Sequence, residues 1–264
     1  MRQAWLALAA FGLIPLCLGC GGSRGTAVSV IGSTSVQPFA EMLAEEFNRN
    51  NGDVRVEVQG GGSTAGIQAV ANGIAQIGTC SRSLKPEETG FTPITIARDG
   101  IAVVVNLANK VSNLSRHQIR AIYEGKITNW RDVGGTDQPI RLITREEGSG
   151  TREAFTHLVM GETRIAASAI TQESNGAVKE LVKNDPGAIG YMSLGLVHGD
   201  LKALTVDGVK ANAGDVINGT YPLVRPFLFV VKGTPDAAAQ RFIDFVLSPP
   251  AQAMLEKEGL VRAK

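Results

Sequence analysis

Short apolar segments rich in β-branched residues alternate with segments of helical periodicity along most of this chain of 264 residues. The pattern predicts strands at residues 27–31, 54–59, 74–79, 101–106, 140–144, 189–192 and 226–231. It predicts helices at residues 36–48, 64–72, 118–123, 151–160, 177–183, 236–247 and 250–258. Such alternation indicates an α/β protein with open sheets covered on both faces. The apolar run at residues 101–106 suits a buried parallel strand.

Two stretches interrupt this alternation and suggest a division into two lobes. At residues 106–113 and 218–225 the apolar strands give way to polar, proline and glycine positions. We therefore expect one lobe to combine residues 27–107 with residues 221–264, and the other to comprise residues 108–220.

Composition excludes several classes of protein. The 26 basic residues nearly balance the 25 acidic ones, which argues against a nucleic-acid partner. An apolar content of 44% is enough to bury a core. The histidines at positions 117, 157 and 198 lack metal-ligand spacing, and the cysteines at 17, 20 and 80 cannot form a disulfide scaffold. We expect neither a metal nor a cofactor.

The N-terminal segment has the features of an export signal. Residues 1–19 combine Arg2, an apolar run and small residues at the end. The sequence LCLGC at residues 16–20 resembles the lipobox of bacterial lipoproteins, which implies that Cys20 is lipidated and anchors the chain to a membrane. An ordinary secretory signal or a plain N-terminal anchor is the alternative. Residues 20–26 then form a tether, and Cys80 is the remaining thiol, more typical of a small buried residue than of a reactive one.

Three loops combine glycine with hydroxyl residues between a predicted strand and a predicted helix. They are GSTS at residues 32–35, GGGST at 60–64 and GSGT at 148–151. Glycine lets the backbone approach a ligand closely, and the free N–H groups of a helix start favour an anion. In open α/β sheets such loops meet at one crevice. Each loop could instead be only a turn with a helix cap, but three together favour an anion site.

Charged residues stand beside these loops. Arg145 could add a charge-assisted hydrogen bond to the anion, and Glu147 could hold its guanidinium in place. Ser81, after the third strand, could face the same crevice. Arg82 could touch the anion or could close the two lobes against each other through an ion pair.

The sequence contains no convincing motif of an enzyme active site. The glycines at residues 60–65 only loosely match a dinucleotide fingerprint, and no acidic residue follows at the next strand. Residues 147–151 do not match a nucleophile elbow. His157 is better explained as a residue on a helix face than as a catalytic base, and Trp130 as a packing anchor. We therefore expect a binding protein, not an enzyme.

Seven ordered motifs carry a family resemblance over residues 27–263. They are GSTSVQP at 32–38, QGGGSTAG at 59–66, IGTCSRSL at 77–84, IYEGKITNW at 122–130, REEGSGT at 145–151, NDPGAIGY at 184–191 and RPFLFVVK at 225–232. The chain resembles the PstS-type phosphate-binding lipoproteins of the phosphate ABC transporter. This implies a two-lobed periplasmic-binding-protein fold of type II, with the ligand in the interlobe cleft. It also implies a periplasmic or cell-surface monomer that delivers inorganic phosphate to the permease subunits.

The resemblance also implies which residues bind phosphate. By matching position they are Arg145, Ser149, Gly150 and Thr151 from the middle lobe, and Thr34, Ser35, the Val36 N–H, Ser63 and Ser81 from the other. Glu147 stands where the family has an acid that pairs with the arginine. Many members carry an aspartate that accepts the proton of hydrogen phosphate and so excludes sulfate. Ser81 occupies that position here, and a hydroxyl can donate or accept.

The mechanism we expect is hinge closure around the anion, with about ten hydrogen bonds from both lobes. A binding protein for another oxyanion, such as sulfate or molybdate, is the first alternative. An exported hydrolase of phosphoesters is the second, although the sequence shows neither a nucleophile–base pair nor a metal cluster.

Overall fold

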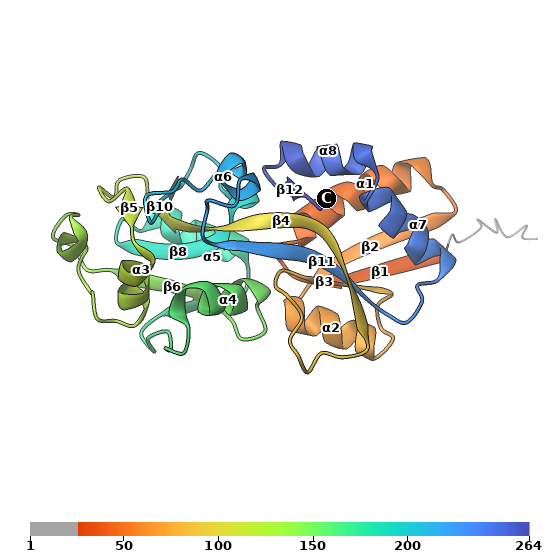
Figure 1. Cartoon of the computed structure of the whole chain (residues 1–264), viewed down its shortest axis with the longest axis horizontal. Coiled ribbons are helices and arrows are strands. Elements are labelled where there is room, and N and C mark those ends of the chain that lie inside the picture. The colour runs from red at the N-terminus through yellow and green to blue at the C-terminus, as the bar shows by residue number, and fades with distance from the viewer. Residues whose placement is uncertain (1–25, 264) are drawn as a thin grey trace, which may run out of the picture.

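The structure is a computed structural model that describes residues 26–263. The chain forms two lobes side by side, joined by two long strands (Figure 1). The expected export signal, the lipidation site Cys20 and almost all of the tether lie outside the described residues.

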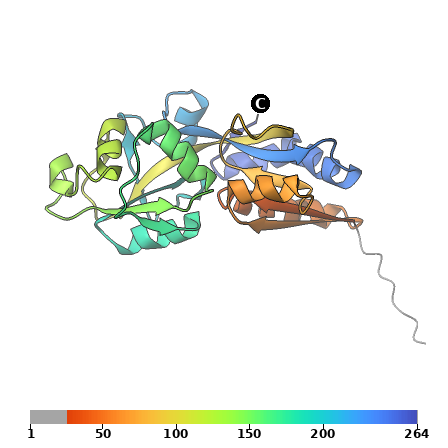
Figure 2. The same ribbon diagram turned by 90° about the horizontal axis from the view of Figure 1, so that it is seen from below.

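The first lobe contains both ends of the described chain. Its strands β1, β2 and β3 are parallel, and β11 joins β3 in the antiparallel sense. Its elements are β1 (Thr26–Gly32), α1 (Gln37–Asn50), β2 (Val54–Gly60), α2 (Ser63–Ala71), β3 (Ile77–Cys80), α7 (Ala237–Val246), α8 (Pro249–Lys257) and β12 (Val261–Arg262). Seen from below, α2 lies next to the second lobe (Figure 2).

The second lobe is built from the middle of the chain. Strands β8, β6 and β7 are mutually parallel. Its strands are β5 (Asn113–Leu114), β6 (Arg141–Arg145), β7 (Ile170–Gln172), β8 (Ala188–Ser193), β9 (Lys202–Ala203) and β10 (Thr205–Val206). Its α-helices are α3 (Arg116–Tyr123), α4 (Gly150–Phe155), α5 (Asn175–Asn184) and α6 (Ala213–Ile217), and α4 continues as a π-helical turn over Thr156–Met160.

Two adjacent antiparallel strands, β4 (Phe91–Val105) and β11 (Val224–Lys232), cross between the lobes. The first part of β4 pairs with β11, and residues 101–105 pair with β8, again antiparallel. The expectation of a parallel strand at residues 101–106 is therefore wrong, although the strand is buried. The pairing partner of β4 changes from β11 to β8 between Gly100 and Ile101. The polar residues Arg98 and Asp99 interrupt the apolar run there.

Each lobe has its own core on both faces of its sheet, as the alternation predicted. In the first lobe, Leu43 of α1 and Phe242 of α7 lie in one cluster, and Ile67 of α2 lies in another on the opposite face. In the second lobe, Phe155 of α4 and Val178 of α5 belong to separate clusters. These clusters hold each sheet between its helices, and the strand ends of the two sheets face each other across the cleft.

Trp130 confirms its expected role as a packing anchor. It is completely buried, and its Nε1 donates a hydrogen bond to the Gly187 carbonyl at 2.9 Å. Cys80 is also buried, and burial raises the pKa of its thiol, which matches an inert packing residue.

Candidate functional site

The site lies where strands of both lobes end and helices begin. Strands β1, β2 and β3 end at Gly32, Gly60 and Cys80 in the first lobe, and β6 ends at Arg145 in the second. Helix α1 starts just after the first of the three glycine-containing loops, and α2 and α4 start within the last residues of the other two. The N–H groups of a first helical turn lack acceptors within the helix. The fold therefore brings the three loops together, as the sequence predicted.

Hydroxyl groups from the two lobes meet in the cleft. Ser35 Oγ lies 2.7 Å from Thr151 Oγ1, which joins the start of α1 to the start of α4. In the first lobe, Ser63 Oγ lies 3.4 Å from Ser81 Oγ, and Ser33 Oγ donates to Ser81 Oγ at 2.9 Å. These side chains are at most 2% exposed. The cleft is closed, with its polar groups shielded from solvent.

Backbone approach between the lobes requires glycine at two positions. A Cβ at Gly150 would overlap Ser63 Oγ and would lie 2.7 Å from Ser81 Oγ. Gly62 has a φ of 93° and approaches the carbonyl of Gly148. Next to it, the Thr64 N–H donates to that carbonyl at 3.1 Å. The loops at residues 60–64 and 148–151 are thus in direct contact across the cleft.

Arg145 is the cation at the centre of this arrangement and is only 1% exposed. Its Nε and Nη2 each donate to one oxygen of Glu146 at 2.9 Å, and Nη2 also reaches Thr34 Oγ1 at 3.0 Å. Its Nη1 is buried and has no hydrogen-bond partner among the described residues. A buried guanidinium N–H without a protein acceptor fits an anion ligand.

Two of the expected roles need correction. Glu147 does not hold Arg145: its side chain is exposed, and Glu146 takes that role. Glu147 was expected from family position, but here its neighbour turns toward the guanidinium. The Val36 N–H donates to the Ser33 carbonyl at 3.1 Å, so it is engaged within its own loop.

Ser149 caps α4 by accepting a hydrogen bond from the Arg152 N–H at 3.3 Å.

Arg82 links the lobes and lies away from the hydroxyl groups. It forms a two-fold hydrogen bond with Glu88 at 2.7 Å and an ion pair with Glu153 of the other lobe at 3.0 Å. Burial alone would lower the pKa of Arg82, but the hydrogen bonds that it donates to Glu88 and the nearby acidic groups raise it well above its usual range. Lys85 also pairs with Glu153, at 2.6 Å. Of the two roles we considered, these contacts support lobe closure.

The structure adds an ion pair that sequence reasoning missed. Arg225 of β11 lies directly opposite Asp99 of β4, and its Nε and Nη2 donate to one Asp99 oxygen at 3.1 and 2.9 Å. Its Nη1 donates to Thr151 Oγ1 at 2.6 Å and to the Ser81 carbonyl at 3.3 Å. Burial raises the pKa of Asp99 and lowers that of Arg225, and their mutual hydrogen bonds oppose both shifts. The available signal was a charged residue inside each of two otherwise apolar strands, Asp99 in β4 and Arg225 in β11.

Asn175 at the start of α5 is a second residue that the sequence did not reveal. It is 2% exposed, and its Nδ2 donates to Ser35 Oγ at 2.9 Å while its Oδ1 accepts from the Ser193 N–H at 3.1 Å. An asparagine at a helix start is common for local reasons, so the sequence contains no signal of this contact.

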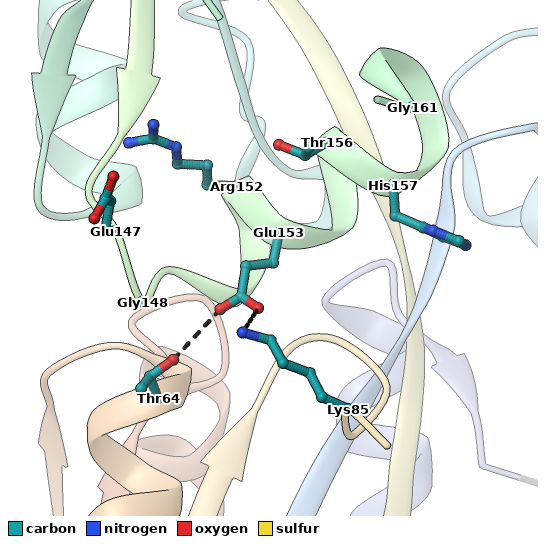
Figure 3. Close-up of a pocket in the computed structure, with 9 residues that line it drawn as sticks. All are labelled: Thr64, Lys85, Glu147, Gly148, Arg152, Glu153, Thr156, His157 and Gly161. Carbon is teal, nitrogen blue, oxygen red and sulfur yellow. Dashed lines mark hydrogen bonds and ion pairs between the residues drawn. The ribbon is translucent and has the colours of Figure 1, made fainter. Parts of the chain in front are cut away.

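A cavity of about 770 Å³ opens beside the closed cleft. Figure 3 shows Glu153 between Thr64 and Lys85 of the other lobe, with His157 and Arg152 on the same wall. His157 is exposed, as expected for a residue on a helix face. The cavity borders the interlobe ion pairs and does not contain the buried hydroxyl groups.

Residues 26–263 contain no group of three or more His, Cys, Asp or Glu side chains placed to hold a metal ion. Within the same range, no helix is long and apolar enough to span a membrane.

Comparison with known proteins identifies the family. A family model described as a PBP superfamily domain matches residues 21–250. The phosphate-binding protein PstS of Bacillus subtilis (strain 168) is 34% identical over 230 residues, which cover 85% of this chain and 76% of that protein. The chain belongs to the PstS family.

Solved structures agree with this assignment to the PstS family. A Clostridium perfringens structure, described as a phosphate ABC transporter substrate-binding protein with bound phosphate, is 41% identical with a TM-score of 0.88. The match covers 90% of this chain and 100% of that one. An ABC-type phosphate transport receptor from Vibrio cholerae is 39% identical with a TM-score of 0.76, covering 89% and 99% of the two chains. The expected periplasmic-binding-protein fold is confirmed.

Proposed function

We propose that this protein captures inorganic phosphate outside the cytoplasm and delivers it to the permease of an ABC transporter. The observation that carries this proposal concerns Arg145. Its buried Nη1 has no hydrogen-bond partner among the described residues, and it lies in a cleft lined by buried hydroxyl groups of both lobes. Names of PstS relatives and a related structure with bound phosphate support the choice of ligand. A binding protein of this family performs no chemistry on its ligand.

The proposed ligand contacts come from both sides of the cleft. In the second lobe, Arg145 supplies a charged donor, and Gly150 and Thr151 supply N–H groups at the first turn of α4. They are joined by the hydroxyl groups of Thr34, Ser35, Ser63, Ser81, Ser149 and Thr151. Val36 remains only as the residue that precedes α1, since its N–H is already engaged.

Binding and closure are coupled in this proposal. Phosphate that bridges the lobes binds the closed state better than the open state, and it therefore shifts the population toward closure. The two strands β4 and β11 provide the hinge at Gly100 and Arg225, with residues 26–99 and 226–263 on one side. The closed form then docks on the permease as a monomer.

Calorimetry on the purified full chain tests the proposal. We expect micromolar or tighter phosphate binding, and a loss of at least about a hundredfold in affinity in Arg145→Ala, since a charge-assisted donor is removed. Arg141→Ala is the matched control, because Arg141 lies on the same strand β6 but is exposed and pairs with Asp185. Absence of phosphate binding by the unmodified chain would overturn the proposed function.

Attachment to a membrane through Cys20 belongs to the same proposal. The sequence at residues 16–20 supports it by its resemblance to a lipobox. We expect Cys20→Ala to prevent labelling of the protein with radioactive palmitate and to release it from the membrane fraction. Cys17→Leu keeps the apolar run and should remain labelled. Equal labelling of the unmodified chain and Cys20→Ala would contradict the anchor without affecting the phosphate site.

A further inference from the structure

Arg225 and Asp99 form an ion pair at the point where the chain passes from one sheet to the other. Arg225 lies directly opposite Asp99 in the register of β11 and β4, and shortly afterwards Ile101 of β4 pairs with Ser193 of β8. The side chains of Arg225 and Asp99 are at most 1% exposed. The pair is therefore buried in the hinge itself.

The first lobe holds the guanidinium of Arg225 in place through several contacts. Its Nε and Nη2 donate to Asp99 Oδ2 at 3.1 and 2.9 Å, and its Nη1 donates to the Ser81 carbonyl just beyond β3 at 3.3 Å. Its central carbon lies 5.1 Å from the centre of the Phe227 ring, which belongs to the core of the first lobe. A cation over an aromatic face is attracted to it. Arg225 is therefore fixed to the first lobe.

One further contact of Arg225 reaches the second lobe. Its Nη1 also donates to Thr151 Oγ1 at 2.6 Å. Thr151 lies in the first turn of α4 and is 1% exposed, and its Oγ1 lies 2.7 Å from Ser35 Oγ. Threonine has few χ1 rotamers because it is β-branched. A fixed donor at its hydroxyl therefore determines where this proposed phosphate ligand places its oxygen.

The two buried arginines of the cleft differ in how far the protein occupies them. Nη1 of Arg145 has no hydrogen-bond partner among the described residues. In contrast, each of the three nitrogens of Arg225 has an acceptor within the protein. Arg145 is thus available for direct contact with the anion, whereas Arg225 reaches the site through Thr151.

Stability alone does not account for the pair of Arg225 and Asp99. The second Asp99 oxygen, Oδ1, is buried and has no hydrogen-bond partner within residues 26–263. Breaking a buried ion pair is costly, yet an imperfectly satisfied pair gives little advantage over apolar side chains of similar size. A role of the arginine at Thr151 explains why two charged residues occur inside apolar strands.

We infer that Arg225 is a positioning residue for phosphate binding, which the first lobe holds at the hinge and directs at Thr151 of the second lobe. The contact forms when the start of α4 meets the first lobe. It therefore stabilises the closed state and places the Thr151 hydroxyl at the ligand in the same step. Asp99 holds Arg225 in this position. Because this role concerns the same site, it rests on the proposed function.

Arg225→Lys in the full chain tests this role and retains the charge beside Asp99. A lysine ammonium lacks the planar fork and cannot serve Asp99 and Thr151 together. We expect the Kd for phosphate to rise about tenfold. The change should appear as faster release of radioactive phosphate in a chase with unlabelled phosphate, because the open state that phosphate enters lacks the contact.

Arg98→Lys is the matched control for this measurement. Arg98 precedes Asp99 on β4 but is exposed, so its replacement should leave both the Kd and the release rate unchanged. An unchanged Kd in Arg225→Lys would overturn the role of Arg225. Slower capture of phosphate with an unchanged release rate would overturn it as well.

A double-mutant cycle separates positioning from a general effect on the hinge. Thr151→Val nearly keeps the shape of the side chain and removes the hydroxyl to which Arg225 donates. In the Thr151→Val background, we expect Arg225→Lys to raise the Kd by less than about twofold. Losses that multiply in the double variant would contradict an action through Thr151. Failure of the unmodified chain to bind phosphate would instead overturn the proposed function.

Asp99→Glu provides a second variant if thermal melting shows that Arg225→Lys does not fold. It keeps both charges but displaces the guanidinium from its place beside Thr151. We expect the same faster release of phosphate, again lost in the Thr151→Val background. Asp53→Glu is the matched control, since Asp53 pairs with Arg241 on the surface. Equal release rates in Asp99→Glu and the unmodified chain would refute the assigned role.

Discussion

Two arginines in the cleft are buried, and each is held by a carboxylate. Arg145 pairs with the adjacent Glu146, whereas Arg225 pairs with Asp99, which is 126 positions away in the chain. Burial of such charges is costly unless they are paired and hydrogen-bonded. Each pair is neutral overall, so the anion meets local donors without a large excess of positive charge.

The pair of Arg225 and Asp99 should matter strongly for stability. We expect Asp99→Asn to lower the free energy of unfolding by about 3–5 kcal/mol, because it leaves a buried guanidinium without its counter-charge. Asp53→Asn is the control, since Asp53 pairs with Arg241 on the surface and should contribute far less to stability. Urea unfolding measures both, and similar losses would contradict this role of burial.

At the scale of elements, local patterns in the sequence predicted more than long-range pairing. The helical periodicity predicted α1 and α7 to within two residues at each end, because their apolar faces repeat along the chain. The direction of β4 relative to β8 could not be predicted, since it depends on a strand far along the chain: Ile101 pairs with Ser193, 92 positions later. Of the site, the three loops were predictable, but Asn175 and Arg225 reach it only through tertiary contacts.

Substitutions of the capping serines of α4 and α5 can separate an effect on folding stability from an effect on phosphate binding. Ser149 caps α4 in the cleft, and Ser174 caps α5 by accepting from the Ala177 N–H. We expect Ser149→Ala and Ser174→Ala each to cost about 1 kcal/mol in unfolding free energy. Only Ser149→Ala should also weaken phosphate binding, by about tenfold, because it removes a donor from the cleft. Equal phosphate affinity in both variants would remove Ser149 from the proposed site.

For the whole molecule, closure is held by contacts outside the ligand site as well as inside it. Glu153 of α4 pairs with both Arg82 and Lys85 of the other lobe, and it accepts from Thr64 Oγ1 at 3.4 Å. These contacts exist only when the lobes meet. They stabilise the closed state independently of the anion, and at the partly exposed Glu153 they are open to screening by salt.

Glu153→Gln should therefore weaken phosphate binding without touching the ligand. We expect the Kd to rise about tenfold, since the closed state becomes less populated. The effect should shrink at high salt, which already screens the pair in the unmodified protein. Titration at low and high salt checks this, with Glu162→Gln as the control at an exposed position just beyond α4. A Kd change that is independent of salt would argue against the ion pairs.

The two crossing strands also determine how the protein loses its structure. Because β4 pairs with β11 in the sheet of the first lobe and with β8 in the sheet of the second, neither lobe has a complete sheet of its own. If one lobe unfolded, β4 would lose its neighbour on that side, and the sheet of the other lobe would lose support from a strand that it shares. We expect calorimetric heating to give a single transition, with equal calorimetric and van't Hoff enthalpies, in spite of two separate cores.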